Sequence, residues 1–146
     1  MKVKLIGMVA AAALVAAASA AGAQAPVTAT PLAVGNIQAT SFHVKSGAAV
    51  LETYTVAPGG SFGWHVHNAP VAVIVQQGTL TVRDPTIGKC APFKVTKGMS
   101  FVEPARHVHL ARNDGKTTVK VYAMYLGLPK SAPSTVPVAA PAGCNG

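Results

Sequence analysis

Two histidines separated by one residue are the first candidates for chemistry in this chain. His65 and His67 lie in the stretch GWHVHNAPV, and the whole sequence holds 5 histidines. Successive side chains of a β-strand point to opposite faces, so residues i and i+2 share a face. A strand here would present both imidazoles to the same side, as a shared metal ion requires. The alternative is a pair of surface histidines without a common ligand.

The elements that must position these histidines are short β-strands. From residue 41 onward, runs such as AVLETYTVA, VAVIVQQ, TLTVRD and TVKVYAMYL are separated by breaks rich in glycine and proline. Strands of about 4–8 residues at regular intervals are typical of an antiparallel sandwich or barrel. No stretch shows sustained helical periodicity with caps. The sequence therefore predicts an all-β fold.

The glycines and histidines of residues 59–113 resemble the two motifs of the cupin superfamily. The first motif, G-x5-H-x-H-x3,4-E-x6-G, is matched at Gly59, His65, His67 and Gly78. The second motif, G-x5-P-x-G-x2-H-x3-N, is matched at Gly98, Pro104, His109 and Asn113. The resemblance implies a single antiparallel β-barrel of jelly-roll type with a metal ion near its centre. It also implies, by position, that His65, His67 and His109 are the metal ligands.

The chain departs from the motifs at two positions. Val71 stands where the family has a metal-binding glutamate, and Arg106 stands where the second motif has its second glycine. Without the glutamate, the ligands would be three neutral imidazoles, which suit Fe(II), Mn(II), Ni(II), Cu(II) or Zn(II). Such a site keeps the full charge of the ion, which favours an anionic or chelating small molecule. The alternative is a barrel that has lost its metal and only binds or packs.

Two further residues are candidates for supporting roles. Glu103 lies on the approach to His109, so it is the best candidate for a partner that orients an imidazole from outside the ligand set. The alternative for Glu103 is a solvated loop residue. His107 would share a strand face with His109, and we consider it as a fourth ligand, a proton shuttle or a residue of the barrel mouth. The alternative for His107 is a histidine that faces solvent.

The two ends of the chain have their own compositions. Residues 1–25 carry Lys2 and Lys4, an apolar run and then small residues, which predicts a secretory signal peptide and a secreted or periplasmic protein. The alternative is an uncleaved membrane anchor. Residues 26–40 are interpreted as a leader strand or linker, 41–128 as the barrel, and 129–146 as a proline- and alanine-rich tail outside it. In an oxidising compartment, a Cys90–Cys144 disulfide would pin this tail, and free thiols are the alternative.

Charge and missing motifs narrow the function classes. Without Lys2 and Lys4 the formal charge of +8 becomes +6, but no dense basic run with interleaved aromatic residues exists, so we expect no nucleic-acid partner. No nucleophile elbow, P-loop or dinucleotide fingerprint appears. Two classes remain: a metal-dependent oxygenase, with an isomerase or hydrolase less favoured, or a non-catalytic small-molecule or metal-binding module. The cupin resemblance also implies a homodimer formed through sheet edges.

Overall fold

The computed structural model describes residues 31–36, 41 and 43–144. The predicted signal peptide and residues 26–30 and 37–40 of the predicted leader lie outside this range. Within it, strands alternate with turns, and no helix is long and apolar enough to cross a membrane. In chain order the elements are β1 (Ala48–Val56), β2 (Ser61–His67), β3 (Val71–Gln77), β4 (Thr79–Arg83), the short 3-10 turn η1 (Gly88–Cys90), β5 (Phe93–Thr96), β6 (Ser100–Glu103), β7 (His109–Arg112), β8 (Val119–Leu128) and β9 (Thr135–Pro137).

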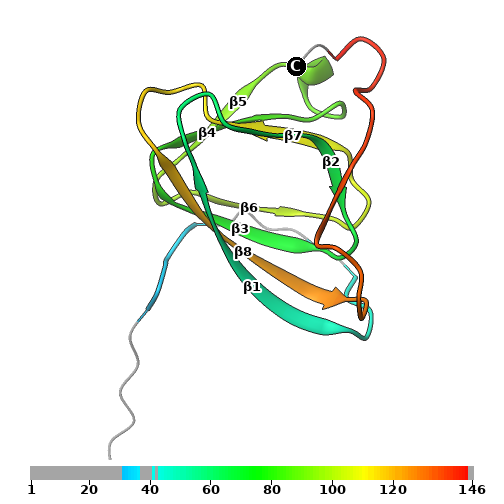
Figure 1. Cartoon of the computed structure of the whole chain (residues 1–146). Coiled ribbons are helices and arrows are strands. Elements are labelled where there is room, and N and C mark those ends of the chain that lie inside the picture. The colour runs from blue at the N-terminus through cyan, green and yellow to red at the C-terminus, as the bar shows by residue number, and fades with distance from the viewer. Residues whose placement is uncertain (1–30, 37–40, 42, 145–146) are drawn as a thin grey trace, which may run out of the picture. The chain divides into compact units, whose positions relative to one another are not determined.

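The strands form two antiparallel sheets that face each other (Figure 1). One sheet has the order β1-β8-β3-β6, and the other has the order β5-β4-β7-β2-β9. The all-β prediction is confirmed, but the prediction of one closed barrel is wrong, because the described strands pair within two separate sheets. Closure needs a continuous hydrogen-bonded ladder around the structure. Strands β5 and β6 follow each other in the chain but belong to different sheets, and the turn at residues 97–99 connects them.

A single apolar core fills the space between the two sheets. Alternate residues of β3 and β8 are buried, as expected for strands with one face toward the core. The second sheet contributes buried aliphatic residues from β4, β5 and β7 to the same cluster. The principal buried members are Val71, Val73, Val75, Leu80, Val82, Val95, Ala111, Val119, Val121, Ala123 and Tyr125. The inner faces of both sheets therefore surround any site that lies between them.

An irregularity in β2 decides which of its side chains point inward. The register against β7 shifts between Ser61 and Trp64, and Gly63 within this bulge has φ 68°. A bulge adds one residue to a strand, and a glycine accepts the left-handed conformation that such a bulge needs. In a regular strand Phe62 and His65 would face opposite sides, because they are three residues apart. With the bulge, both line the same cavity.

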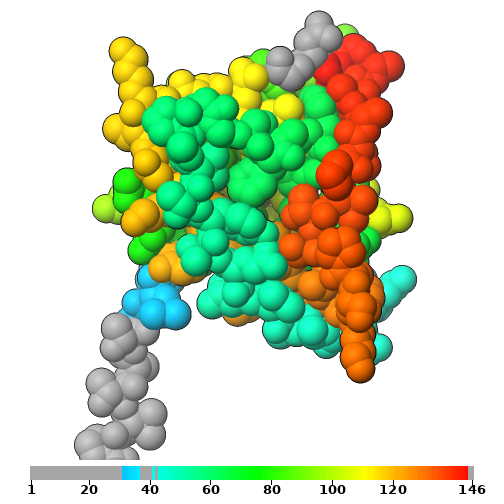
Figure 2. Space-filling view, in the orientation of Figure 1, coloured from blue at the N-terminus to red at the C-terminus, as the bar shows by residue number. Residues whose placement is uncertain are grey.

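The C-terminal segment joins the sheets instead of lying outside them. We expected residues 129–146 to be a separate tail, but Thr135–Pro137 forms β9 and pairs with β2. The segment runs from the end of β8 along one side of the molecule toward the other sheet (Figures 1 and 2). There Cys144 lies at disulfide distance from Cys90, with Cα atoms 5.5 Å apart. Because β9 is an edge strand, it tolerates Pro137. The prolines of this segment therefore argued against a strand in the sequence, although one forms.

Candidate metal centre

Two neighbouring strands bring three histidines together between the sheets. His65 and His67 share the inward face of β2, and His109 begins β7 directly opposite His65 in the antiparallel register. The three side chains are buried, with residue exposures of 3%, 5% and 2%. One ring nitrogen from each lies within 4.8 Å of the others. Sequence spacing predicted the shared face of the first two, and the β2–β7 register brings in the third.

Each of the three imidazoles is held by a backbone carbonyl at its Nδ1 atom. A carbonyl oxygen only accepts hydrogen bonds, so each Nδ1 donates, and the Nε2 atom of a neutral ring is left with a free lone pair. This is how ligating histidines are commonly oriented in metal sites. The pairs are His65 with Gly63 at 2.9 Å, His67 with Ser134 at 3.0 Å, and His109 with His107 at 3.1 Å.

A carboxylate reaches the histidine cluster from the opposite sheet. Glu103, at the end of β6, places its Oε2 atom 3.1 Å from Nε2 of His67 and 3.0 Å from Nε2 of His109. Burial alone would raise the pKa of Glu103, but hydrogen bonds from His109 and His67 outweigh burial and hold that pKa at about 2. Glu103 is therefore a buried anion, 7% exposed, and not a solvated loop residue.

The histidines respond in opposite directions to this environment. Burial, together with the nearby charge of His109, lowers the pKa of His65 to about 4. Burial also disfavours the charged form of His109, but the hydrogen bond and the negative charge of Glu103 outweigh it and raise the pKa of His109 above its ordinary value. The His65 ring is thus neutral at physiological pH, and the neutral ring is the form that binds a metal ion.

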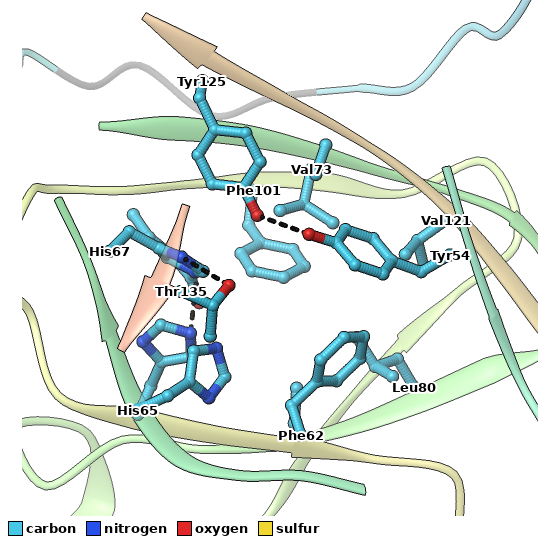
Figure 3. Close-up of a pocket in the computed structure, with 14 residues that line it drawn as sticks. Tyr54, Phe62, His65, His67, Val73, Leu80, Phe101, Val121, Tyr125 and Thr135 are labelled. Atoms are coloured by element: carbon cyan, nitrogen blue, oxygen red, sulfur yellow. Dashed lines mark hydrogen bonds and ion pairs between the residues drawn. The ribbon is translucent and has the colours of Figure 1, made fainter. Parts of the chain in front are cut away.

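A small cavity opens beside the cluster and is lined mainly by apolar side chains (Figure 3). It contains about 370 Å³ of space, counting space open to solvent. The aromatic and aliphatic walls come from both sheets. They include Phe62, Val73, Leu80, Phe101, Ala111, Val121 and Ala123. The cavity therefore suits a small molecule with an apolar body, next to a polar group of histidines.

Two tyrosines supply hydroxyl groups on the other side of this cavity. The Tyr54 and Tyr125 hydroxyls are 3.1 Å apart (Figure 3). The Tyr54 hydroxyl donates to the carboxylate of Glu52, which also accepts a hydrogen bond from Ser134 at 3.2 Å. Burial is the main cause that raises the pKa of both phenols, so both stay neutral and can donate hydrogen bonds.

His107 lies outside the cluster. Its Nε2 atom is 2.6 Å from Oδ2 of Asp84, and that carboxylate also accepts hydrogen bonds from the backbone and the hydroxyl of Thr86. The ring is therefore held by the loop after β4. The contribution of His107 to the site is its backbone carbonyl, which accepts from Nδ1 of His109.

Sequence analysis missed two groups that support the histidines. Asp84, the partner of His107, comes from a loop with no motif, and nothing in its spacing marks it. Ser134 acts through its backbone carbonyl, which has no side-chain signature in any sequence. The β-prone run Thr135–Val138 was the one available signal that this segment could reach β2.

Two facing antiparallel sheets with a histidine cluster between them are the arrangement that the cupin resemblance leads one to expect. The cupin domain family matches residues 52–125, about half of the chain, which includes both motifs. The chain therefore belongs to the cupin family. No curated protein matches the chain.

Solved structures with low sequence identity bear on the fold alone, and among the three compared below only the first has a TM-score above 0.5. The DMSP lyase DddQ from Ruegeria pomeroyi matches with a TM-score of 0.53 and 16% identity over 62% of this chain and 43% of that chain. The polyketide cyclase RemF from Streptomyces resistomycificus gives a TM-score of 0.49 and 21% identity over 56% of each chain. A cupin-2 domain protein from Shewanella frigidimarina gives 0.45 and 21%, over 61% of this chain and 82% of that chain. The chain thus matches only about half the length of the first two proteins.

Proposed function

We propose that this cupin binds one divalent metal ion through the Nε2 atoms of His65, His67 and His109. The observation that carries the proposal is the backbone carbonyl at each Nδ1 atom, because it leaves the Nε2 atom of each ring as the metal-binding nitrogen. One ring nitrogen of each histidine lies within 4.8 Å of the others, as one shared ion requires. Imidazole nitrogen suits Fe(II), Ni(II), Cu(II) and Zn(II), and Mn(II) is also accommodated where oxygen ligands take part. A bound ion would supply Lewis acidity and positions for a further ligand.

The proposed ligand of the metal-loaded protein is a small molecule with a chelating or anionic head and an apolar body. The head would face the histidines, where the ion concentrates positive charge in a buried site. The body would contact walls such as Phe62 and Phe101, which line the cavity. A hydrogen-bond donor at the other end could reach the Tyr125 hydroxyl oxygen, since the Tyr54 proton is donated to Glu52 and the Tyr125 proton to Tyr54. The modest volume of the cavity limits this molecule to a small one.

A titration with Co(II) tests the metal proposal, because histidine-bound cobalt absorbs visible light. Chelator-treated protein should bind one equivalent, and His109→Ala should abolish that binding. His43→Ala is the matched control, since His43 is exposed and lies outside the cluster. Unchanged binding by the His109 variant, or an equal loss with the His43 variant, would overturn the proposal.

A metal-dependent dioxygenase is the second candidate, and the apolar cavity walls favour it because they exclude water from a reactive centre. In such a reaction both atoms of O₂ enter the substrate, so one O₂ is consumed per substrate without an external reductant. Oxygen-electrode measurements on Fe(II)-loaded protein with small chelating acids and diketones would test it. Consumption that stops in His109→Ala supports an enzyme. Ligand binding without consumption across this panel favours a non-catalytic module.

We also propose that the protein works in an oxidising compartment outside the cytosol. The pairing of Cys90 and Cys144 at disulfide distance supports this location, since structural disulfides persist mainly in exported proteins. The predicted signal peptide lies outside the described residues and stays a prediction. The homodimer and the absence of a nucleic-acid partner also stay predictions, which light scattering and an electrophoretic binding assay would test.

A further inference from the structure

From the contacts of Glu103 we infer that this residue is a fourth metal ligand and replaces, from a neighbouring strand, the glutamate that the first cupin motif lacks at Val71. The inference rests on the proposed three-histidine site. It changes the charge of that site, because one carboxylate and three neutral imidazoles reduce the net charge of a bound divalent ion from +2 to +1.

Strand pairing places the two positions side by side. In the antiparallel β3–β6 register, Val71 lies directly opposite Glu103, and on its other side Val71 pairs with Tyr125 of β8. Directly opposite residues point to the same face of a sheet, with Cβ atoms about 4.5–5.5 Å apart. A glutamate side chain from either position therefore starts on the same inward face and close to the same point. Moving the carboxylate from β3 to β6 keeps it within reach of the histidines.

Glu103 contacts the imidazole nitrogens that would bind the metal, and not the nitrogens on the far side of the rings. A group that orients a ligating histidine contacts its non-ligating nitrogen, which is Nδ1 here. Those atoms are already bonded to backbone carbonyls. Glu103 instead faces the Nε2 atoms of His67 and His109, on the metal side of both rings. The role that we expected for Glu103, outside the ligand set, therefore does not match the atoms it contacts.

The distances also fit one shared ion. Two ligands at about 2.1 Å from an ion and at a right angle to each other stand about 3 Å apart. The carboxylate oxygen lies 3.1 Å and 3.0 Å from the two Nε2 atoms. With each Nδ1 donating to a carbonyl, a neutral ring offers only a lone pair to this oxygen, so a proton or a metal ion must lie between the two atoms. In the metal-free protein a proton on Nε2 makes the hydrogen bond to Glu103, and a bound ion would take the place of that proton. In the described part of the chain, the ion pairs of Glu103 involve these two histidines and no lysine or arginine.

A double-substitution cycle at Val71 and Glu103 tests the inference by Co(II) affinity. Glu103→Val should weaken binding by about tenfold or more, as loss of a ligand or its close partner typically does. Val71→Glu should add nothing in the native background, since one carboxylate already fills the role. In the Glu103→Val background, the same Val71→Glu substitution should restore affinity. If the site consisted of the three histidines without a carboxylate ligand, Val71→Glu would instead raise the Co(II) affinity equally in both backgrounds.

Controls separate this inference from the proposed site itself. Asp114→Asn removes an acid at an exposed hairpin, where it pairs with Arg112, and should leave the affinity unchanged. Urea unfolding of each metal-free variant checks that the fold persists. A native affinity in His109→Ala would overturn the three-histidine site. A large loss in His109→Ala with an equal Val71→Glu gain in both backgrounds would overturn only the role of Glu103.

Discussion

Removal of the Cys90–Cys144 link should destabilise the protein and loosen the metal centre together. Cys90 and Cys144 lie at disulfide distance, and a bond between them would close a loop with a sequence separation of 54 residues. The chain-entropy relation for a loop of this length gives about 4 kcal/mol at 25 °C, and measured losses are typically about 2–4 kcal/mol. At about 4 °C per kcal/mol for a domain of this size, the thermal midpoint should fall by about 8–16 °C.

The loss should extend to metal binding because the fastened segment supports His67. The carbonyl of Ser134 accepts from His67 Nδ1, and β9 pairs with the part of β2 that carries both histidines. A loosened segment would free the His67 ring to turn away. Because these backbone pairs remain after the link is cut, we expect a smaller effect on Co(II) affinity than on unfolding, about tenfold or less.

The assay compares native protein with the Cys90→Ala/Cys144→Ala variant by urea unfolding and by Co(II) titration. Alanine is the appropriate replacement because both cysteines are buried, and a serine hydroxyl there would need its own partner. Reduced native protein serves as the matched comparison without a substitution. An unfolding midpoint within error of the native one would refute the claim that the link fastens this segment.

Three further predictions concern pH, a motif residue and the glycines. The metal-free protein should lose about 3 kcal/mol of stability as pH falls from about 6.5 to 4, because the pKa of His65 drops from 6.5 to about 4 on folding and the unfolded chain binds that proton first. The His65→Asn variant should flatten this part of the plot of urea midpoint against pH. An unchanged slope in that variant would contradict the prediction. Asn113→Ala should lower the free energy of unfolding in urea by about 2–4 kcal/mol, because the buried Asn113 amide donates to the carbonyls of Val56 and Thr117. A loss below about 1 kcal/mol would show that water replaces these hydrogen bonds. Gly63→Ala should cost about 1–2 kcal/mol of stability, because Gly63 has a positive φ although a Cβ there would have open space. Gly127→Ala should cost more, because its Cβ would collide with the backbone of Lys45. Equal losses of stability in thermal unfolding would refute the collision.

The sequence was most informative where a local pattern decides the structure. The short β-rich runs over β3 and β8, bounded by turn residues, predicted strands, and the i, i+2 spacing predicted that His65 and His67 point the same way. The second motif added His109, whose position opposite His65 follows from the pairing of β2 with β7. These features depend on spacing within one strand or on a motif that spans two.

Features that depend on long-range pairing could not be predicted from the same patterns. Glu103 reaches the cluster only because β6 pairs with β3 and faces the other sheet, and no local signal states which strands are neighbours. The prolines of the C-terminal segment argued against a strand, but an edge position tolerates Pro137. Short strands separated by turns are equally typical of a closed barrel and of two facing sheets, so this pattern could not decide whether the hydrogen-bonded ladder closes.

A crystal structure of the metal-loaded protein, with anomalous data collected at the absorption edge of the ion, tests the central claim most directly. The account predicts one ion per chain, with the Nε2 atoms of His65, His67 and His109 at about 2.0–2.2 Å. It also predicts a carboxylate oxygen of Glu103 in the same coordination shell. An anomalous peak away from the three rings, or binding through Nδ1 atoms, would contradict the metal site.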